Sequence, residues 1–243
     1  MSDWIIPDWP APSSVHAVIT TRTGGYSQAP YNSLNLAEHV DDDPVVVAKN
    51  RSLLRERLLL PSEPMWLQQV HGCVVVESAG GEDDNCADAS STTVSGKVCV
   101  VMTADCLPLL LCNRSGTRVA AVHAGWRGLA DGVIEAAMAK FSEPGEELLA
   151  WLGPAIGPKE FEVGAEVRER FIEENPADEA AFMAKGSDKW LADIYALART
   201  RLQSENCGYI GGGDYCTVTE YERFFSYRRD GITGRMAALI WIE

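Results

Sequence analysis

Two short apolar runs near the middle of the chain, Val98–Met102 and Arg118–Val122, constrain the fold most strongly. Both are rich in β-branched residues and too short for helices, so each predicts a buried strand. A reactive residue follows each run: Cys106 comes shortly after the first, and His123 directly follows the second. Loops at strand ends are free to direct side chains toward a ligand. We therefore expect the thiol and the imidazole to lie at a site of chemistry.

Composition bounds the class of protein. The 243 residues contain no linker-like stretch and no repeat, which favours one domain over residues 1–243. With 35 acidic against 21 basic residues, the formal net charge of −14 argues against a nucleic-acid partner, and an anionic substrate would need a local basic pocket. We predict no signal peptide and no membrane segment, hence a cytoplasmic protein. The seven cysteines lack CxxC spacing and fit reduced thiols.

Local patterns predict a mixture of strands and helices. Further strands are expected over Ser14–Thr21 and Glu147–Leu152, as a pair over Met65–Val70 and Cys73–Glu77, and as a hairpin of Phe224–Arg229 with Arg235–Ile242. Helices are expected over Pro44–Leu59, Leu129–Phe141, Val163–Glu174 and Lys189–Ser204, and an acidic loop over Gly80–Asn85. Because strands and helices do not alternate regularly, we expect an α/β fold of the α+β type: a layered α-β-β-α sandwich with mixed sheets.

A third reactive residue, His71, stands in a His-Gly turn between the two strands of the predicted pair. One Cys and two His make a three-ligand zinc set that leaves a fourth position open, as catalytic zinc sites require, and the soft thiolate also admits copper. Their spacing is not a standard zinc motif. The residues alone therefore leave a second interpretation open, a metal-free hydrolase in which Cys106 is the nucleophile and His71 or His123 its base.

Three arginines are candidates for binding an anionic substrate. Arg127 lies beside His123 where a helix is predicted to begin, and free N–H groups in the first helical turn suit a phosphate. Arg22, at the end of the first predicted strand, and Arg228 could add paired donors. Asp105 precedes Cys106 and is a candidate general acid, or a residue that caps a turn or orients a ligand.

Six different short motifs occur along the chain, each of them once. They are TRTGG containing Arg22, SLNL at Ser33–Leu36, QVHG at Gln69–Gly72, TADCLP at Thr103–Pro108, HAGWRG at His123–Gly128 and SYRR at Ser226–Arg229. In this set the sequence resembles the YfiH family, also called the laccase-domain or polyphenol oxidase family. The resemblance spans essentially the whole chain. Tyr26 departs from it, because most members have a small or aliphatic residue after the paired glycines, and this difference bears on substrate preference.

The resemblance implies that His71, Cys106 and His123 are metal ligands, normally for zinc. It implies phosphorolysis of adenosine, inosine, guanosine and methylthioadenosine, and hydrolytic deamination of adenosine; a homodimer is compatible with it. The family has also been linked to peptidoglycan precursor editing, in which a Cys/His site would hydrolyse a UDP-muramyl-serine bond. A multicopper oxidase needs on the order of ten histidines. This chain has four, so only weak oxidation by copper in the single site remains open.

Overall fold

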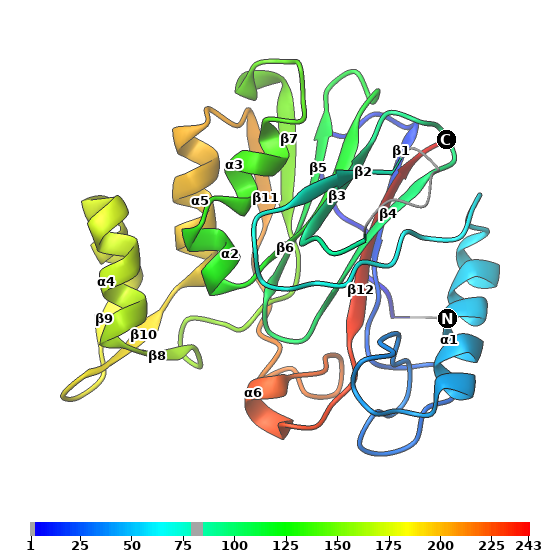
Figure 1. Cartoon of the computed structure of the whole chain (residues 1–243), viewed down its shortest axis with the longest axis horizontal. Helices are drawn as coiled ribbons and strands as arrows, with labels where there is room; N and C mark the ends of the chain where they lie inside the picture. Colours follow the sequence, from blue (N-terminus) through cyan, green and yellow to red (C-terminus); the bar gives the residue numbers. More distant parts are fainter. Residues whose placement is uncertain (1–2, 79–84) are drawn as a thin grey trace.

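Two sheets packed face to face form the centre of the computed structural model, which describes residues 3–78 and 85–243 (Figure 1). The larger sheet has the order β11 (Tyr209–Gly212), β7 (Leu148–Leu152), β5 (Leu107–Asn113), β6 (Val119–Ala124), β3 (Ala89–Thr92) and β2 (Val75–Glu77). The smaller has the order β1 (Val15–Ile19), β12 (Met236–Ile242) and β4 (Val98–Thr103). The smaller sheet is antiparallel, whereas the larger is mixed, with β11–β7 and β2–β3 parallel.

Helices cover the outer face of each sheet, as Figure 1 shows. On the larger sheet lie α2 (Trp126–Ala130), α3 (Val133–Met138) and α5 (Ile194–Ser204); on the smaller lies α1 (Pro44–Leu58). A small sheet of β8 (Glu162–Gly164), β10 (Lys189–Ala192) and β9 (Phe182–Ala184) stands to one side with α4 (Ala165–Glu174). The short elements are η1 (Gly145–Glu147), η2 (Pro176–Ala181) and α6 (Tyr227–Asp230). The layers confirm the predicted α-β-β-α sandwich.

Strand β5 shows why the central sheet is apolar on both faces. Leu107, Leu109 and Leu111 pack beneath the helices, while Leu110 and Cys112 point into the core between the two sheets. Successive side chains of a strand face opposite ways, so a strand covered on both sides has no polar positions to spare. All seven residues of β5 are buried, which anchors the residues just before it.

Several predicted elements are confirmed together with their end signals. Helix α1 begins where Asp43 accepts a hydrogen bond from the Val45 N–H (2.8 Å) and Pro44 occupies the first turn. The strands predicted over 14–21, 98–102, 118–122 and 147–152 are β1, β4, β6 and β7. The helix predicted over 163–174 is α4, which begins two residues later than expected.

Two predicted helices were too long. The helix expected over Leu129–Phe141 is split into α2 and α3, because Gly132 adopts a left-handed conformation (φ 91°) between them. The helix expected over Lys189–Ser204 begins only at Ile194, where the Asp193 side chain accepts from the Ala196 N–H. The residues before that cap form strand β10.

The predicted strand pair and hairpin are also wrong in one member each. Residues 66–70 form no strand, because the Gln69 amide makes the bonds a neighbouring strand would make, donating to the Met102 carbonyl and accepting from its N–H (both 2.8 Å). Residues 224–229 turn into α6, where Ser226 accepts from the Arg229 N–H. The acidic loop expected over Gly80–Asn85 lies outside the described residues except for its last position.

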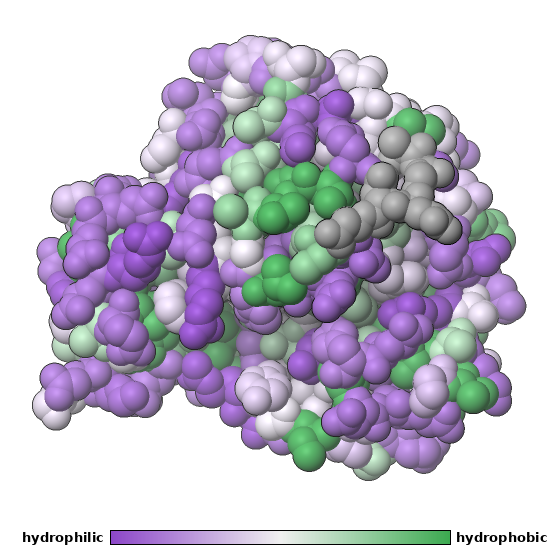
Figure 2. Space-filling model, in the orientation of Figure 1, coloured by the Kyte–Doolittle hydropathy of each residue, from purple (hydrophilic) through white to green (hydrophobic). Residues whose placement is uncertain are grey.

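One face of the surface can be compared with the composition. The face in Figure 2 is mostly hydrophilic, with apolar side chains gathered in a small area near its middle. Among residues 3–78 and 85–243, no helix has the length and apolar character needed to cross a membrane.

Candidate active site

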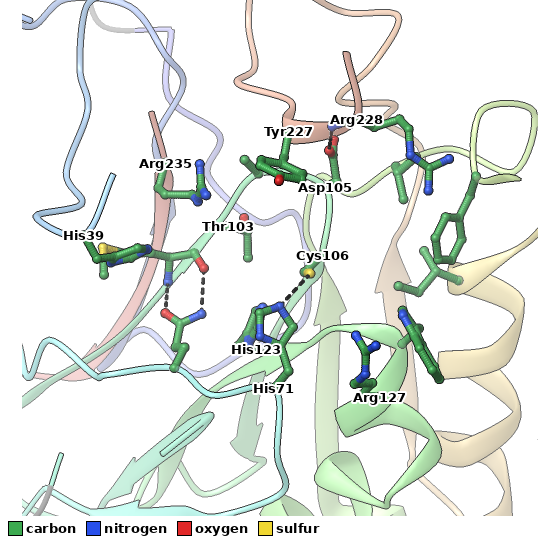
Figure 3. Close-up of a pocket in the computed structure, with 17 residues that line it drawn as sticks. His39, His71, Thr103, Asp105, Cys106, His123, Arg127, Tyr227, Arg228 and Arg235 are labelled. Carbon is green, nitrogen blue, oxygen red and sulfur yellow. Dashed lines mark hydrogen bonds between the residues drawn. The ribbon is translucent and has the colours of Figure 1, made fainter. Parts of the chain in front are cut away.

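His71, Cys106 and His123 meet at one end of the larger sheet (Figure 3). His123 lies in β6 and Cys106 directly precedes β5, and these antiparallel strands pair with Pro108 opposite His123. His71 approaches from the preceding loop. The potential ligand atoms of the three residues all lie within 4.8 Å of one another, with Cys106 Sγ 3.8 Å from His71 Nε2. The structure thus brings together the three residues that the sequence selected.

Asp88, just before β3, holds both histidines in place. Its buried carboxylate accepts a hydrogen bond from His123 Nδ1 (2.8 Å) and from the backbone N–H groups of His71 (2.9 Å) and Gly72 (2.6 Å). The His123 N–H also donates to the Asp88 carbonyl (2.7 Å). His71 has a left-handed backbone (φ 62°), a conformation that costs energy for a residue with a side chain. The carboxylate therefore stabilises a turn that the sequence alone would disfavour.

The charges of the site reinforce one another. Burial raises the pKa of Asp88, but hydrogen bonds from His123 and Gly72 outweigh it and leave that pKa low. Burial lowers the pKa of His123, yet Cys106 and Asp88 raise it to about 9. Burial likewise raises the pKa of Cys106, while His123 and, to a smaller extent, His71 lower it to about 6. Cys106 is therefore a thiolate at neutral pH, the form that binds metals and attacks electrophiles.

Two glycines of the HAGWRG motif leave room for this arrangement. A Cβ on Gly125 would lie 2.8 Å from His71 Cδ2 and 3.2 Å from Cys106 Sγ. A Cβ on Gly128 would lie 2.6 Å from the Gly72 carbonyl oxygen. Both positions exclude a side chain because the His71–Gly72 turn packs directly on them.

Asp105 serves the backbone around the site. Its Oδ1 accepts from the Thr217 hydroxyl and its Oδ2 from the Arg228 N–H, both at 2.6 Å. Its own backbone is left-handed (φ 94°). With both oxygens accepting hydrogen bonds, this geometry favours the turn-holding role over that of general acid.

A cavity of about 480 Å³ opens above the three residues. Its apolar and aromatic lining includes Trp126, Ile156, Phe161 and Ile194. Three arginines line it, Arg127, Arg228 and Arg235, against a single carboxylate among the described residues, that of Asp105. A cationic cavity in a chain of net charge −14 is the local basic pocket that an anionic substrate requires.

Two of the three predicted arginines reach this cavity. Arg127 stacks on the Trp126 ring (4.4 Å to its centroid), and Arg228 lies over Phe161 and donates to the Glu160 carbonyl. Arg22 does not line it: its guanidinium donates to the carbonyls of Asn32 and Tyr221 and borders a separate hollow. The expectation that Arg22 helps to form the substrate pocket therefore finds no support in the geometry.

Sequence reasoning missed Asp88, His39 and Arg235. Asp88 has a weak signal, a lone carboxylate flanked by Ala87 and Ala89 at the start of a buried strand. His39 and Arg235 come from loops far apart in the chain, so no local pattern joins them to the cavity.

The donor set fits a single metal ion. Two imidazoles and a thiolate are ligands that zinc accepts, and the Asp88 bond to His123 Nδ1 leaves Nε2 of that ring for a metal. It does not fit a multicopper cluster. Of the two other histidines, His16 pairs with Glu243 and stacks on Trp241, and His39 lines the cavity without joining the group, so the described residues offer one such site.

Residues 16–243 match the family described as multi-copper polyphenol oxidoreductase laccase. The chain belongs to this family. It is 55% identical over 243 residues to the purine nucleoside phosphorylase YfiH of Escherichia coli (strain K12), and the match covers both chains completely. A protein of Haemophilus influenzae named purine nucleoside phosphorylase is 47% identical over 241 residues, covering 98% of this chain and 99% of the relative. These relatives confirm the resemblance to the YfiH family.

Solved structures share the fold. The crystal structure of Neisseria meningitidis protein NMB0706 superposes with a TM-score of 0.94 at 50% identity and covers 99% of each chain. The Bacillus licheniformis hypothetical protein YfiH gives a TM-score of 0.88 at 26% identity, covering 98% of this chain and 99% of its own.

Proposed function

We propose that this protein is a zinc-dependent purine nucleoside phosphorylase that also deaminates adenosine. The observation that carries the proposal is the convergence of His71, Cys106 and His123, with ligand atoms within 4.8 Å, at a cavity lined by three arginines. The names of the Escherichia coli and Haemophilus relatives support a phosphorylase. Adenosine, inosine, guanosine and methylthioadenosine are the proposed substrates, with phosphate as the second substrate.

The cavity suits these substrates in size and lining. Its volume of about 480 Å³ falls in the range of small-molecule pockets, roughly 300–1,000 Å³. The guanidinium groups of Arg127 and Arg228 lie over the rings of Trp126 and Phe161, and this aromatic and planar cationic lining suits a purine. Arg127 and Arg228 are the proposed substrate-binding residues carried over from the sequence.

In phosphorolysis a phosphate oxygen forms a bond to ribose C1′ as the C1′–N9 bond breaks. The bonding pair stays with the purine, which takes up a proton and leaves as the free base beside ribose 1-phosphate. Arginine donors would bind the phosphate and disperse its charge. When bound by His71, Cys106 and His123, zinc would supply Lewis-acid chemistry at neutral pH.

In deamination water adds at purine C6 and ammonia departs, which converts adenosine to inosine without phosphate. Asp88 holds the imidazole of His123. Together with the thiolate of Cys106, this imidazole would mark the place in the cavity where C6 of the purine reacts. Each Asp105 oxygen already accepts a hydrogen bond, one from Thr217 and one from the Arg228 N–H, so we assign delivery of this proton to another group.

The test is chromatography of adenosine products from zinc-loaded protein with and without phosphate. We expect adenine and ribose 1-phosphate with phosphate, and inosine without it. Cys106→Ala should abolish both products and the bound zinc. Wild-type protein that carries stoichiometric zinc and forms neither product would refute the proposal.

One observation favours a second candidate. The 3.8 Å contact between Cys106 Sγ and His71 Nε2, with the Cys106 pKa near 6, also suits a metal-free thiolate nucleophile that hydrolyses a UDP-muramyl-serine substrate. Turnover of that substrate in a strong chelator, lost in Cys106→Ala, would establish this activity in place of the first.

A further inference from the structure

The cavity has different side chains on the two sides of Cys106 and His71. Figure 3 shows Arg127 on one side of that pair, and Arg235 and His39 on the other, with Thr103 between them and Cys106. The Arg127 side is aromatic, because Arg127 lies over the Trp126 ring. The Arg235 side carries the polar side chains of His39 and Thr103 beside the Tyr227 ring. A phosphorylase must bind two substrates that differ in the same way: a planar purine and a small anion with four oxygens.

Arg235 is held by hydrogen bonds from its backbone N–H and from one nitrogen of its guanidinium, which leaves other guanidinium N–H groups available. Its backbone N–H donates to Asn35 Oδ1 (3.0 Å), and its Nη1 donates to the carbonyls of Thr233 (2.9 Å) and Gly234 (3.0 Å). Within residues 3–78 and 85–243, no group accepts a hydrogen bond from its Nε or Nη2. A guanidinium fixed through one nitrogen and free at two others presents the paired N–H groups that bind phosphate oxygens.

Arg235 is also a cation without a salt-bridge partner among the described residues. It lies half-buried beside the cavity, and burial lowers its pKa, although an arginine stays protonated in proteins. The negative charges of Cys106 and Asp105 oppose that lowering, but neither is within salt-bridge or hydrogen-bond reach of Arg235 among the described residues, and Asp105 already accepts from Thr217 and Arg228. By contrast, Arg118 and Arg168 have carboxylate partners. A desolvated, unpaired cation gains more from an anionic ligand than an exposed one does.

The neighbours of Arg235 complete an anion site. Burial, together with the charges of Arg235 and Arg51, lowers the pKa of His39, so this imidazole is neutral at neutral pH and can donate a hydrogen bond without adding charge. Thr103 brings a hydroxyl to the same side of the cavity. Neither side chain offers an acidic group that would repel an anion.

We propose that Arg235, assisted by His39 and Thr103, binds the phosphate substrate, while the purine binds on the Trp126 and Phe161 side of the cavity. This inference rests on the proposed phosphorylase function and assigns its second substrate to a residue outside the recognised motifs. Arg235 is accordingly the residue that sets specificity for phosphate.

Binding of inorganic phosphate tests the assignment without turnover. Titration calorimetry of wild type, Arg235→Met and Arg235→Lys, each with and without zinc, should show that Arg235→Met weakens phosphate binding by roughly 10- to 100-fold. Arg235→Lys should recover part of that loss, because it restores the charge but not the fork of donors. Arg170→Met, at an exposed arginine paired with Asp131, is the matched control and should bind phosphate as wild type does.

Kinetics separates this inference from the proposed function. In phosphorolysis of inosine, Arg235→Met should raise the KM for phosphate by about the same factor and change the KM for inosine by less than roughly 3-fold. An unchanged KM for phosphate in an active variant would overturn the assignment and leave the phosphorylase standing. Wild type that binds phosphate through Arg235 but releases no purine would refute the phosphorylase and retain the anion site. A thermal unfolding scan checks that each variant folds.

Discussion

His123 and His71 face the same thiolate but are held in opposite ways. His123 is buried in β6, where strand pairing on both sides fixes its backbone. His71 is exposed, on a left-handed turn in a loop without strand partners. Asp88 joins the two, because one carboxylate binds the ring of the first and the backbone of the second. Regular structure positions one histidine; a single buried side chain positions the other.

Loss of Asp88 should disturb both histidines, because it removes the support that they share. Asp88→Ala leaves His123 Nδ1 and the N–H groups of His71 and Gly72 without their acceptor. We expect a loss of about 3–5 kcal/mol in the free energy of unfolding, together with a 10- to 100-fold weaker affinity for zinc. Urea unfolding and a competitive zinc titration measure the two effects.

Asp88→Asn is the matched control because it keeps the size and one acceptor oxygen. This variant should be less destabilised than Asp88→Ala, but it should still bind zinc more weakly than wild type does. The neutral amide no longer favours a charged imidazole at His123. Wild-type zinc affinity in Asp88→Ala would show that the two histidines are held independently.

Replacing each histidine in turn should show that the buried one controls the thiol. His123 lowers the Cys106 pKa more than His71 does. In metal-free His123→Gln the pKa of Cys106 should return toward about 8.5–9, so the thiolate fraction at pH 7, and with it the rate of alkylation by iodoacetamide, should fall by roughly 30- to 90-fold. His71→Gln should slow it less. Peptide mapping by mass spectrometry follows Cys106 separately from the other cysteines, and a larger effect of His71→Gln would reverse the ranking.

Gly125→Ala should displace the exposed histidine more than Cys106, whose Sγ would lie 3.2 Å from the added Cβ. The added methyl group would lie 2.8 Å from His71 Cδ2, and the turn that carries His71 can yield more easily than a paired strand. We expect about 10-fold weaker zinc binding with the fold retained. Gly72→Ala is the control from the same turn, because its nearest contact would be an ordinary 3.5 Å to Asp88 Oδ2. Equal affinities in the two variants would show that the close contact is tolerated.

The same contrast explains what the sequence could predict. Strands β4 and β6 follow from β-branched apolar runs, and the start of α1 follows from Asp43 and Pro44, because these signals are local. Cys106 and His123 adjoin such strands and could be found. The loop that carries Gln69 was mistaken for a strand because its amide replaces a strand partner, which no periodicity reveals.

The rest of the site depends on contacts between distant segments. Asp88 acts on a turn 16 residues away, and Arg235 meets a cavity built mostly from residues before position 162. The motif arginine Arg22, by contrast, is taken up by the carbonyls of Asn32 and Tyr221. Residue type and spacing indicate candidates; tertiary contacts decide which of them share a cavity.

The positive charge of the cavity is opposite in sign to the net charge of the whole chain. This difference affects the rate at which an anion reaches the cavity. A phosphate dianion approaching a protein of net charge −14 is repelled at long range and attracted only near the three arginines. The Debye length is about 10 Å at 0.1 M salt, so added salt shortens the reach of the distant repulsion before it weakens the close attraction. We therefore expect the encounter rate with phosphate to rise with ionic strength at first, the opposite of ordinary electrostatic steering.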